Sequence, residues 1–163
     1  MARDLERSLG LVRVELDALF HKPGWEETPV SEFRASVAEA LSVGRWVVDG
    51  NYRTVSDMTQ GWADTIVWLD LSRSLVTSRV TRRTLRRIWR REELWNGNRE
   101  TLLRALSPDA EKSIIVWTWQ RHPRYREMYE NQLDGPLWSR STVVRLRTRR
   151  EVREWLATTV ASS

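Results

Sequence analysis

The sequence contains no cysteine and only two histidines, His21 and His122, which lie far apart in the chain. Disulfide bridges and cysteine-ligated metal ions are therefore excluded. A zinc cluster is not expected either, because zinc sites need several cysteine or histidine ligands. The lack of cysteine fits a protein of the reducing cytoplasm, and we expect a cytoplasmic location.

Long apolar runs are also missing. No stretch approaches the roughly 20 apolar residues that a membrane-spanning helix requires, and charged residues interrupt the first ten positions, unlike a signal peptide. We therefore expect no membrane partner. The 163 residues, 40% of them hydrophobic, suffice for one core, so residues 1–163 are predicted to form a single domain.

Lysine is scarce. The 27 basic residues include only Lys22 and Lys112, so the others are arginine, and the formal net charge is +5. Part of this bias reflects a GC-rich genome, because arginine has GC-rich codons and lysine does not. Arginine is also the better side chain for two-pronged recognition of phosphate. The positions of the arginines are therefore more informative than their number.

Apolar, β-branched segments alternate with amphipathic ones along the chain. Strands are predicted at 12–16, 46–49, 65–69 and 142–146. Helices are predicted at 5–9, 28–44, 74–89, 107–119 and 148–157. Strands that alternate with helices indicate an α/β fold, a parallel sheet flanked by helices that binds ligands at the carboxyl ends of its strands.

Local signals mark the helix ends. Gly10 is expected to close the first helix in a left-handed conformation, and Thr28 with Pro29 is expected to open the second. The capping box from Thr148 to Glu151 predicts the start of the last helix. A helix break is predicted at His122, before a proline. The apolar face of the second helix is predicted from the spacing of Val30, Phe33, Val37 and Leu41.

Three aspartates follow predicted strands, namely Asp17, Asp49 and Asp70. Aspartate commonly caps the turn or helix after a strand, and this role is favoured for Asp70. Asp49 belongs to a denser pattern, because Gly50 permits a sharp turn and Arg53 follows closely. A carboxylate suited to hydrated Mg²⁺ and a guanidinium suited to phosphate then lie at one edge of the sheet.

The predicted helix at 74–89 and the residues just after it carry a dense set of arginines. These are Arg79, Arg82, Arg83, Arg86, Arg87, Arg90 and Arg91. At about 100° per residue they spread over roughly half of the helix circumference. A solvated basic face is one interpretation of this pattern. Phosphate recognition is a second, and nucleic-acid binding is a third.

The segment from Asp49 to Thr54 resembles the Asp-Gly-Phe-Pro-Arg-Thr segment of nucleoside monophosphate kinases, with Asn51 and Tyr52 in place of Phe and Pro. The segments 15–19, 23–25 and 92–100 extend the resemblance to the adenylate-kinase-like P-loop proteins often called topology modulation proteins. This resemblance implies ATP-dependent phosphoryl transfer to a small acceptor, with a nucleotide as one candidate. It also implies Mg²⁺ as cofactor and ATP as co-substrate.

The resemblance also assigns roles. Acceptor binding is assigned to Asp17, Gly50, Asn51 and Arg53, and Mg²⁺ binding to Asp49. The segment at about 74–106 resembles a mobile lid. By the same resemblance, the charge of the transferring phosphoryl group would be stabilised by Arg79, Arg83 and Arg99. Trp25 and Trp95 occupy loops near the expected cleft.

One part of the family pattern is missing. The family begins with a strand and a Gly-x-x-Gly-x-Gly-Lys-Ser/Thr loop, whose backbone N–H groups hold the donor phosphates, and residues 1–163 contain no such loop. We therefore expect an N-terminally truncated P-loop kinase-like fold that is inactive in phosphoryl transfer. In the family, the absent strand lies between the strands at 46–49 and 65–69. Their inner edges should be left unpaired, or should pair directly with each other.

Two other classes of function stay open. One is a nucleotide-binding pseudo-kinase that acts by interaction with another protein. The other is a nucleic-acid-binding protein that uses the arginine-rich helix, which would make its affinity strongly dependent on salt.

Overall fold

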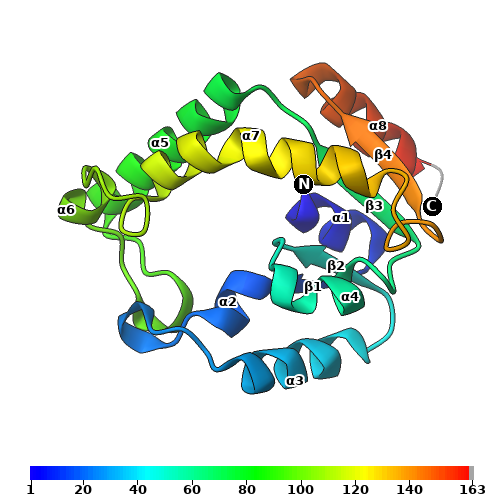
Figure 1. Ribbon diagram of the computed structural model, residues 1–163, viewed down its shortest axis with the longest axis horizontal. Coiled ribbons are helices and arrows are strands. Elements are labelled where there is room, and N and C mark those ends of the chain that lie inside the picture. The colour runs from blue at the N-terminus through cyan, green and yellow to red at the C-terminus, as the bar shows by residue number, and fades with distance from the viewer. Residues whose placement is uncertain (162–163) are drawn as a thin grey trace.

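The structure, a computed structural model, describes residues 1–161. In this part of the chain, short parallel strands alternate with helices (Figure 1). The strands are β1 (Val12–Glu15), β2 (Trp46–Asp49), β3 (Thr65–Leu69) and β4 (Thr142–Leu146). The longer helices are α1 (Ala2–Leu9), α3 (Val30–Leu41), α5 (Arg73–Arg90), α7 (Ile114–Gln132) and α8 (Arg149–Ala161). The shorter helical segments are α2 (Leu16–Phe20), η1 (Pro23–Trp25), η2 (Arg53–Val55), α4 (Ser56–Thr59), η3 (Trp95–Gly97) and α6 (Leu102–Ala105). The predicted α/β class is confirmed.

The strands form two separate two-stranded parallel sheets. β1 pairs with β2, with Val12 opposite Trp46, and β3 pairs with β4, with Thr65 opposite Thr142. Within residues 1–161, β2 and β3 share no hydrogen-bonded ladder, so each has an inner edge without a strand partner. From the sequence we expected the inner edges of these strands either to be unpaired or to pair directly with each other. In the structure they are unpaired. The single continuous sheet implied by an ordinary α/β fold is not formed by these strands.

The open inner edges leave apolar strand residues accessible. Strands of a parallel sheet are normally buried on both faces. Here Val47, Val48, Ile66 and Val67 are only half-buried, and Leu69 is 41% exposed. Helices hold the two sheets together, since α1 contacts both strands of the first sheet and also α8, which follows β4 (Figure 1).

The main apolar core lies between the first sheet and α3. Phe33, Val37 and Leu41 are buried there against Val14 and Leu16. Their spacing of four residues places them on one helix face, as predicted. Val30 was predicted on the same face, but it is 60% exposed because it is the first residue of the helix.

Two predictions about helix ends need correction at the start of α3. Thr28 does not cap this helix. Its hydroxyl donates a hydrogen bond to the carbonyl oxygen of Leu19, at 3.0 Å, and Pro29 occupies the N-cap position instead of the first helical position. The other predicted helix ends are closer. Gly10 ends α1 with φ 63°, and Thr148 Oγ1 accepts a hydrogen bond from the backbone N–H of Glu151.

The helix predicted at 107–119 is also placed wrongly. α6 ends at Ala105, and α7 begins at Ile114, where Ser113 Oγ accepts a hydrogen bond from the backbone N–H of Val116 at 3.4 Å. Between these helices, the Asp109 side chain accepts a hydrogen bond from the backbone N–H of Glu111 at 2.9 Å. The residues after position 107 therefore form a turn, and the helix starts at its serine cap.

The predicted helix break near His122 is wrong, because α7 continues through Pro123. Proline has no backbone N–H, so the carbonyl of Trp119, four residues earlier, loses its helical donor. Arg73 replaces that donor. Its Nε lies 2.6 Å from the Trp119 oxygen, and its guanidinium lies 3.7 Å from the centre of the Trp119 ring. The side chain of α5 thus satisfies the carbonyl that the proline leaves free.

Candidate functional site

Residues that follow β1, β2 and β3 lie in one region of the molecule. Asn51, two residues after β2, and Asp70, directly after β3, line the same cavity of about 220 Å³. Asp17, two residues after β1, accepts a hydrogen bond of 2.7 Å from the hydroxyl of Tyr52. The carboxyl ends of the strands therefore converge, as the α/β pattern predicted.

The turn after β2 depends on Gly50. Its φ is 134°, and a Cβ at this position would lie 2.9 Å from the Cβ of Leu16. Only glycine accommodates both the backbone conformation and the close approach. Gly50 therefore contributes to the site by shaping the turn that leads to Asn51 and Tyr52.

Asp17 and Tyr52 form a partly buried hydrogen-bonded pair. Burial raises the pKa of the Tyr52 hydroxyl, and the nearby Asp17 carboxylate raises it further, so the phenol stays protonated and donates to Asp17. His21 Nε2 lies 3.5 Å from the same hydroxyl, and burial lowers the pKa of His21. Near neutral pH the imidazole of His21, beside this pair, is therefore uncharged.

Arg83, one of the predicted catalytic residues, interacts electrostatically with Asp17 and Asp49. Burial among protein atoms lowers the pKa of its guanidinium, the charge of Arg87 lowers it further, and Glu100, Asp17 and Asp49 act in the opposite direction. Its side chain is nevertheless accessible to solvent, and within residues 1–161 no carboxylate forms an ion pair with it. The Arg83 guanidinium is therefore exposed to solvent and also surrounded by many protein atoms. The structure thus brings Arg83 within electrostatic reach of Asp17 and Asp49.

Asp49 is a single exposed carboxylate. It is 59% exposed, and its nearest cation is Arg13, with Nη1 at 3.9 Å from Oδ2. In the described part of the chain, no group of three or more histidine, cysteine, aspartate or glutamate side chains could hold a metal ion. Mg²⁺ usually binds one or two protein carboxylates together with substrate phosphates and water. Asp49 therefore fits one ligand of an ion that arrives with a phosphate, whereas a preformed metal cage is not present in residues 1–161.

The donor triphosphate of ATP does not fit the residues present. Its binding in the family depends on a glycine-rich loop whose backbone N–H groups surround the phosphates. The sequence from 1 to 163 has no such loop. The described residues therefore include no cradle of this kind for a donor triphosphate.

The other predicted site residues differ in their contacts. Arg53 in η2 and Arg79 in α5 are exposed, and no described side chain forms an ion pair or hydrogen bond with their guanidinium groups. Arg99 pairs with the exposed Glu93 at 3.4 Å. Asn51 donates a hydrogen bond of 2.6 Å from its Nδ2 to the hydroxyl of Tyr129.

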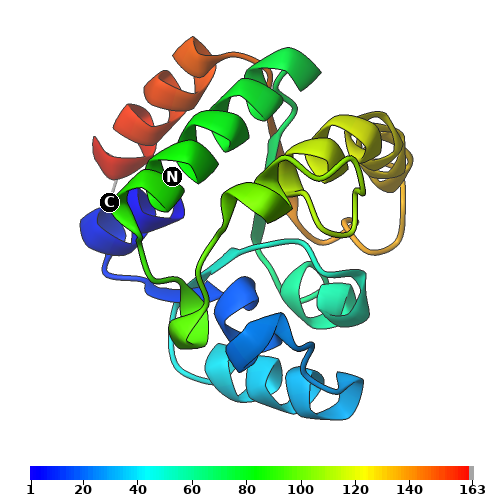
Figure 2. The same cartoon turned by 90° about the vertical axis from the view of Figure 1, so that its left-hand side faces the viewer.

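Two loops with similar shapes close one side of the site. An isolated antiparallel bridge joins the ends of each, His21 to Glu27 in one and Glu93 to Arg99 in the other. Figure 2 shows the segment after α5 reaching the loop between α2 and α3. We call the segments 21–27 and 93–99 the paired loops.

Asn98 ties the paired loops together. It is only 3% exposed, its Oδ1 accepts a hydrogen bond from the backbone N–H of Trp25, and its Nδ2 donates to the carbonyls of Lys22 and Trp95, all at 2.9 Å. Asn96 Nδ2 donates to the carbonyl of His21 at 2.5 Å. This contact could not be predicted from the sequence, because the partners in the other loop lie more than 70 residues away.

The tryptophans of the paired loops are engaged by protein groups. Trp95 Nε1 donates a hydrogen bond of 2.8 Å to Glu15, and the guanidinium of Arg87 lies 5.9 Å from the Trp95 ring. The guanidinium of Arg104 lies 5.4 Å from the Trp25 ring. These contacts favour a structural role for both indoles over stacking on a ligand.

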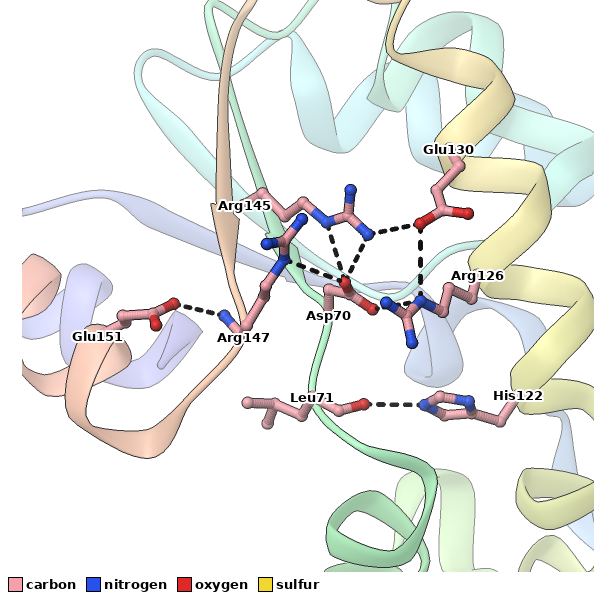
Figure 3. Close-up of polar contacts among 8 residues, drawn as sticks. All are labelled: Asp70, Leu71, His122, Arg126, Glu130, Arg145, Arg147 and Glu151. Carbon is pink, nitrogen blue, oxygen red and sulfur yellow. Dashed lines mark hydrogen bonds and ion pairs between the residues drawn. The ribbon is translucent and has the colours of Figure 1, made fainter.

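Asp70 is the centre of a charged cluster that the sequence analysis missed (Figure 3). Its side chain is 2% exposed and accepts hydrogen bonds from Arg145 Nε at 2.9 Å and Nη2 at 2.7 Å. Arg126 Nε lies 3.3 Å from the other carboxylate oxygen, and Arg147 Nε lies 3.7 Å away. The prediction that Asp70 caps the following helix is wrong, because Ser72 occupies the N-cap position of α5. The one signal available in the sequence was an arginine, Arg145, within an apolar strand.

The arginine-rich helix is partly neutralised. Glu92 lies within 4.0 Å of Arg86, Arg87 and Arg90, and Arg87 also pairs with Glu100 at 3.3 Å. The arginines of this set without an ion-pair partner among the described residues are Arg79, Arg82, Arg83 and Arg91. The uninterrupted basic face that nucleic-acid binding would favour is therefore reduced to these positions.

Comparison with protein-family models, curated proteins and solved structures found no match to this chain. Across residues 1–161, none of the helices combines the length and the apolar character needed to cross a membrane. Inference about function therefore depends on the geometry of the site and on the motifs of the sequence.

Proposed function

We propose that this chain binds a phosphorylated small molecule, with a nucleotide as the first candidate, as the acceptor side of an ATP-dependent kinase of the P-loop type. Arg83 carries the proposal. It is an exposed guanidinium without an ion-pair partner among the described residues, and burial among protein atoms and the nearby charge of Arg87 disfavour its charge. A phosphate bound there would supply the missing negative charge through charge-assisted hydrogen bonds.

The division of the strands into two pairs supports a kinase of this type. In the family that the sequence resembles, a further strand lies between the strands that correspond to β2 and β3. The unpaired inner edges of β2 and β3 are what that arrangement leads us to expect of these strands alone. The absence of cysteine fits the cytoplasm, where ATP is present.

The groups of the chain suggest how an acceptor would be held. Arg83 would bind the phosphate, and Asp17, fixed by Tyr52, would accept a hydrogen bond from a hydroxyl or amine of the acceptor. Asp49 would contribute one ligand to a Mg²⁺ ion that arrives with phosphate. ATP would supply the γ-phosphoryl group when bound. Because residues 1–163 lack a donor cradle, we propose acceptor binding without phosphoryl transfer for this chain alone, the behaviour of a nucleotide-binding pseudo-kinase.

Isothermal titration with the four common ribonucleoside monophosphates and with inorganic phosphate tests the proposal. Replacing Arg83 by methionine should weaken phosphate-dependent binding by about 1.5 to 3 kcal/mol, the scale of a hydrogen bond to a charged group. Arg82→Met is the matched control, because Arg82 is also exposed and without an ion pair among the described residues but points about 100° away around the helix. The control should bind as the unmodified chain does. Equal losses in both variants, or no binding of any probe at low salt, would contradict the assignment.

A further inference from the structure

A cavity of about 220 Å³, open to solvent, is bordered by the end of β3, α5 and α7. Most residues that line this cavity have no role in the proposed binding of the acceptor. Its aromatic side chains are Trp68, Trp117, Tyr125 and Tyr129. Val76 of α5 closes the opposite side.

The aromatic rings form a continuous lining. Ring centres are 5.5 Å apart for Trp117 and Tyr125, 6.3 Å for Tyr125 and Tyr129, and 5.8 Å for Trp68 and Tyr129. The spacing of three or four residues between Thr118, His122, Tyr125 and Tyr129 places these side chains on one face of α7. Flat π-faces of this kind bind planar rings by stacking.

Polar groups lie at the edges of the cavity. His122 Nε2 lies 2.9 Å from the carbonyl oxygen of Leu71 (Figure 3). Because a carbonyl oxygen only accepts, Nε2 carries the proton and Nδ1 is left as an acceptor. Asn51 donates one N–H to Tyr129, so its second N–H and its Oδ1 are available. The lining therefore offers both a donor and acceptors.

The charged groups at the cavity are already paired with one another. Asp70 lines the cavity, but Arg145 and Arg126 occupy both of its carboxylate oxygens. Arg126 in turn also lies 3.7 Å from Glu130. A charged ligand would have to compete with these ion pairs, so an uncharged ligand suits the cavity better.

The volume limits the ligand further. Pockets for drug-sized molecules have roughly 300 to 1,000 Å³, so about 220 Å³ is too small for a whole nucleotide and suits one ring system. We propose that this cavity binds a neutral, planar heteroaromatic ring, the class that includes the nucleobases, with one face against the aromatic lining of Tyr125 and Tyr129 and its edge toward Asn51 and His122. The site requires no phosphate, so it goes beyond the acceptor proposal.

Titration with adenosine, guanosine, cytidine and uridine tests this site, because nucleosides have the ring and lack the phosphate. At least one should bind. Tyr129→Leu removes a stacking face and should weaken binding roughly 5- to 150-fold, the range measured for base–aromatic stacking. Val76→Phe fills the cavity from α5 and should abolish binding by a different route. Trp89→Leu, at an exposed position, is the control and should leave the affinity for the nucleoside unchanged.

The outcomes separate this site from the phosphate site. No binding of any of the four nucleosides would overturn the ring site, as would binding that neither Tyr129→Leu nor Val76→Phe weakens. If one variant fails to fold, the other decides. Arg83→Met should leave nucleoside binding intact, so failure of the phosphate assignment is seen only with the phosphorylated probes.

Discussion

At the scale of the residue, the carbonyl of Trp119 shows how one contact decides a local structure. Proline at 123 removes its helical donor, and the sequence alone predicted that the helix would end there. The guanidinium of Arg73, 46 residues earlier, provides the replacement hydrogen bond. Because the compensating group lies on another helix, no local pattern could have predicted the continuation of α7.

A double-mutant cycle tests this compensation. Arg73→Met should lower the free energy of unfolding by about 1 to 3 kcal/mol, because it leaves a helix carbonyl without a donor and removes the stacking on Trp119. In a Pro123→Ala background the same change should cost less, since alanine restores the backbone N–H. Urea unfolding of the four proteins measures the coupling. Additive effects of the two substitutions would show that the hydrogen bond has no energetic role.

Also at the scale of the residue, His21 should make the free energy of unfolding depend on pH. Burial lowers its pKa in the folded protein below the ordinary value near 6.5, so the unfolded chain binds a proton more readily than the folded one. The contribution of the neutral ring to stability is therefore complete above about pH 6.5 and is lost as the pH falls through the lowered pKa. The free energy of unfolding should fall between about pH 7 and 5, and His21→Gln should reduce this slope. An unchanged slope in the variant would exclude His21 as its source.

At the scale of the element, the paired loops are held together by side-chain hydrogen bonds, among which those of Asn98 are buried. Asn98 of the second loop hydrogen-bonds to the backbone of the first at Lys22 and Trp25. The lid-like segment predicted at about 74–106 is therefore held against the loop after α2 in this structure. The loop on which the turn at Trp95–Gly97 docks could not be predicted from sequence spacing.

Asn98→Ala should loosen both loops at once. Removal of three hydrogen bonds from a buried amide leaves backbone groups at Lys22, Trp25 and Trp95 without their partner. Amide hydrogen exchange should increase in 21–27 as well as in 93–99. Glu93→Ala changes an exposed side chain of the same loop and serves as control, with exchange in 21–27 unaffected. Faster exchange confined to 93–99 in the Asn98 variant would mean that the loops are independent.

At the scale of the whole molecule, elements were more predictable than their assembly. β2, β3 and β4 match their predicted ranges because each is a run of mainly apolar, often β-branched residues with no competing helical spacing. The region after position 107 was missed because its Ser-Pro pair resembles a helix start, whereas the cap is Ser113. The cluster around Asp70 depends on Arg126 and Arg145, which only the fold brings near.

The candidate site divides in the same way. Gly50 and Asp49 were located by a short motif, since both belong to the turn that ends a strand. The cavity under α7 was not predicted, because its walls come from separate elements and its aromatic residues have the spacing of an ordinary core helix. A turn motif can be predicted from residues that are adjacent in the sequence, whereas a cavity is formed by residues that come together only after folding.

The unpaired edges of β2 and β3 have a consequence for how the molecule behaves among copies of itself. An open strand edge with half-buried valine and isoleucine beside it is a template for strand addition, and natural sheets usually protect such edges with charge, proline or a covering segment. Apart from Asp49, the residues of β2 and β3 carry no charge and no proline. An extended segment that pairs with these edges competes with strand addition by another copy of the chain. Such a segment therefore also suppresses aggregation. The solubility of the protein should therefore rise with the fraction of molecules in which the edges of β2 and β3 are paired with such a segment.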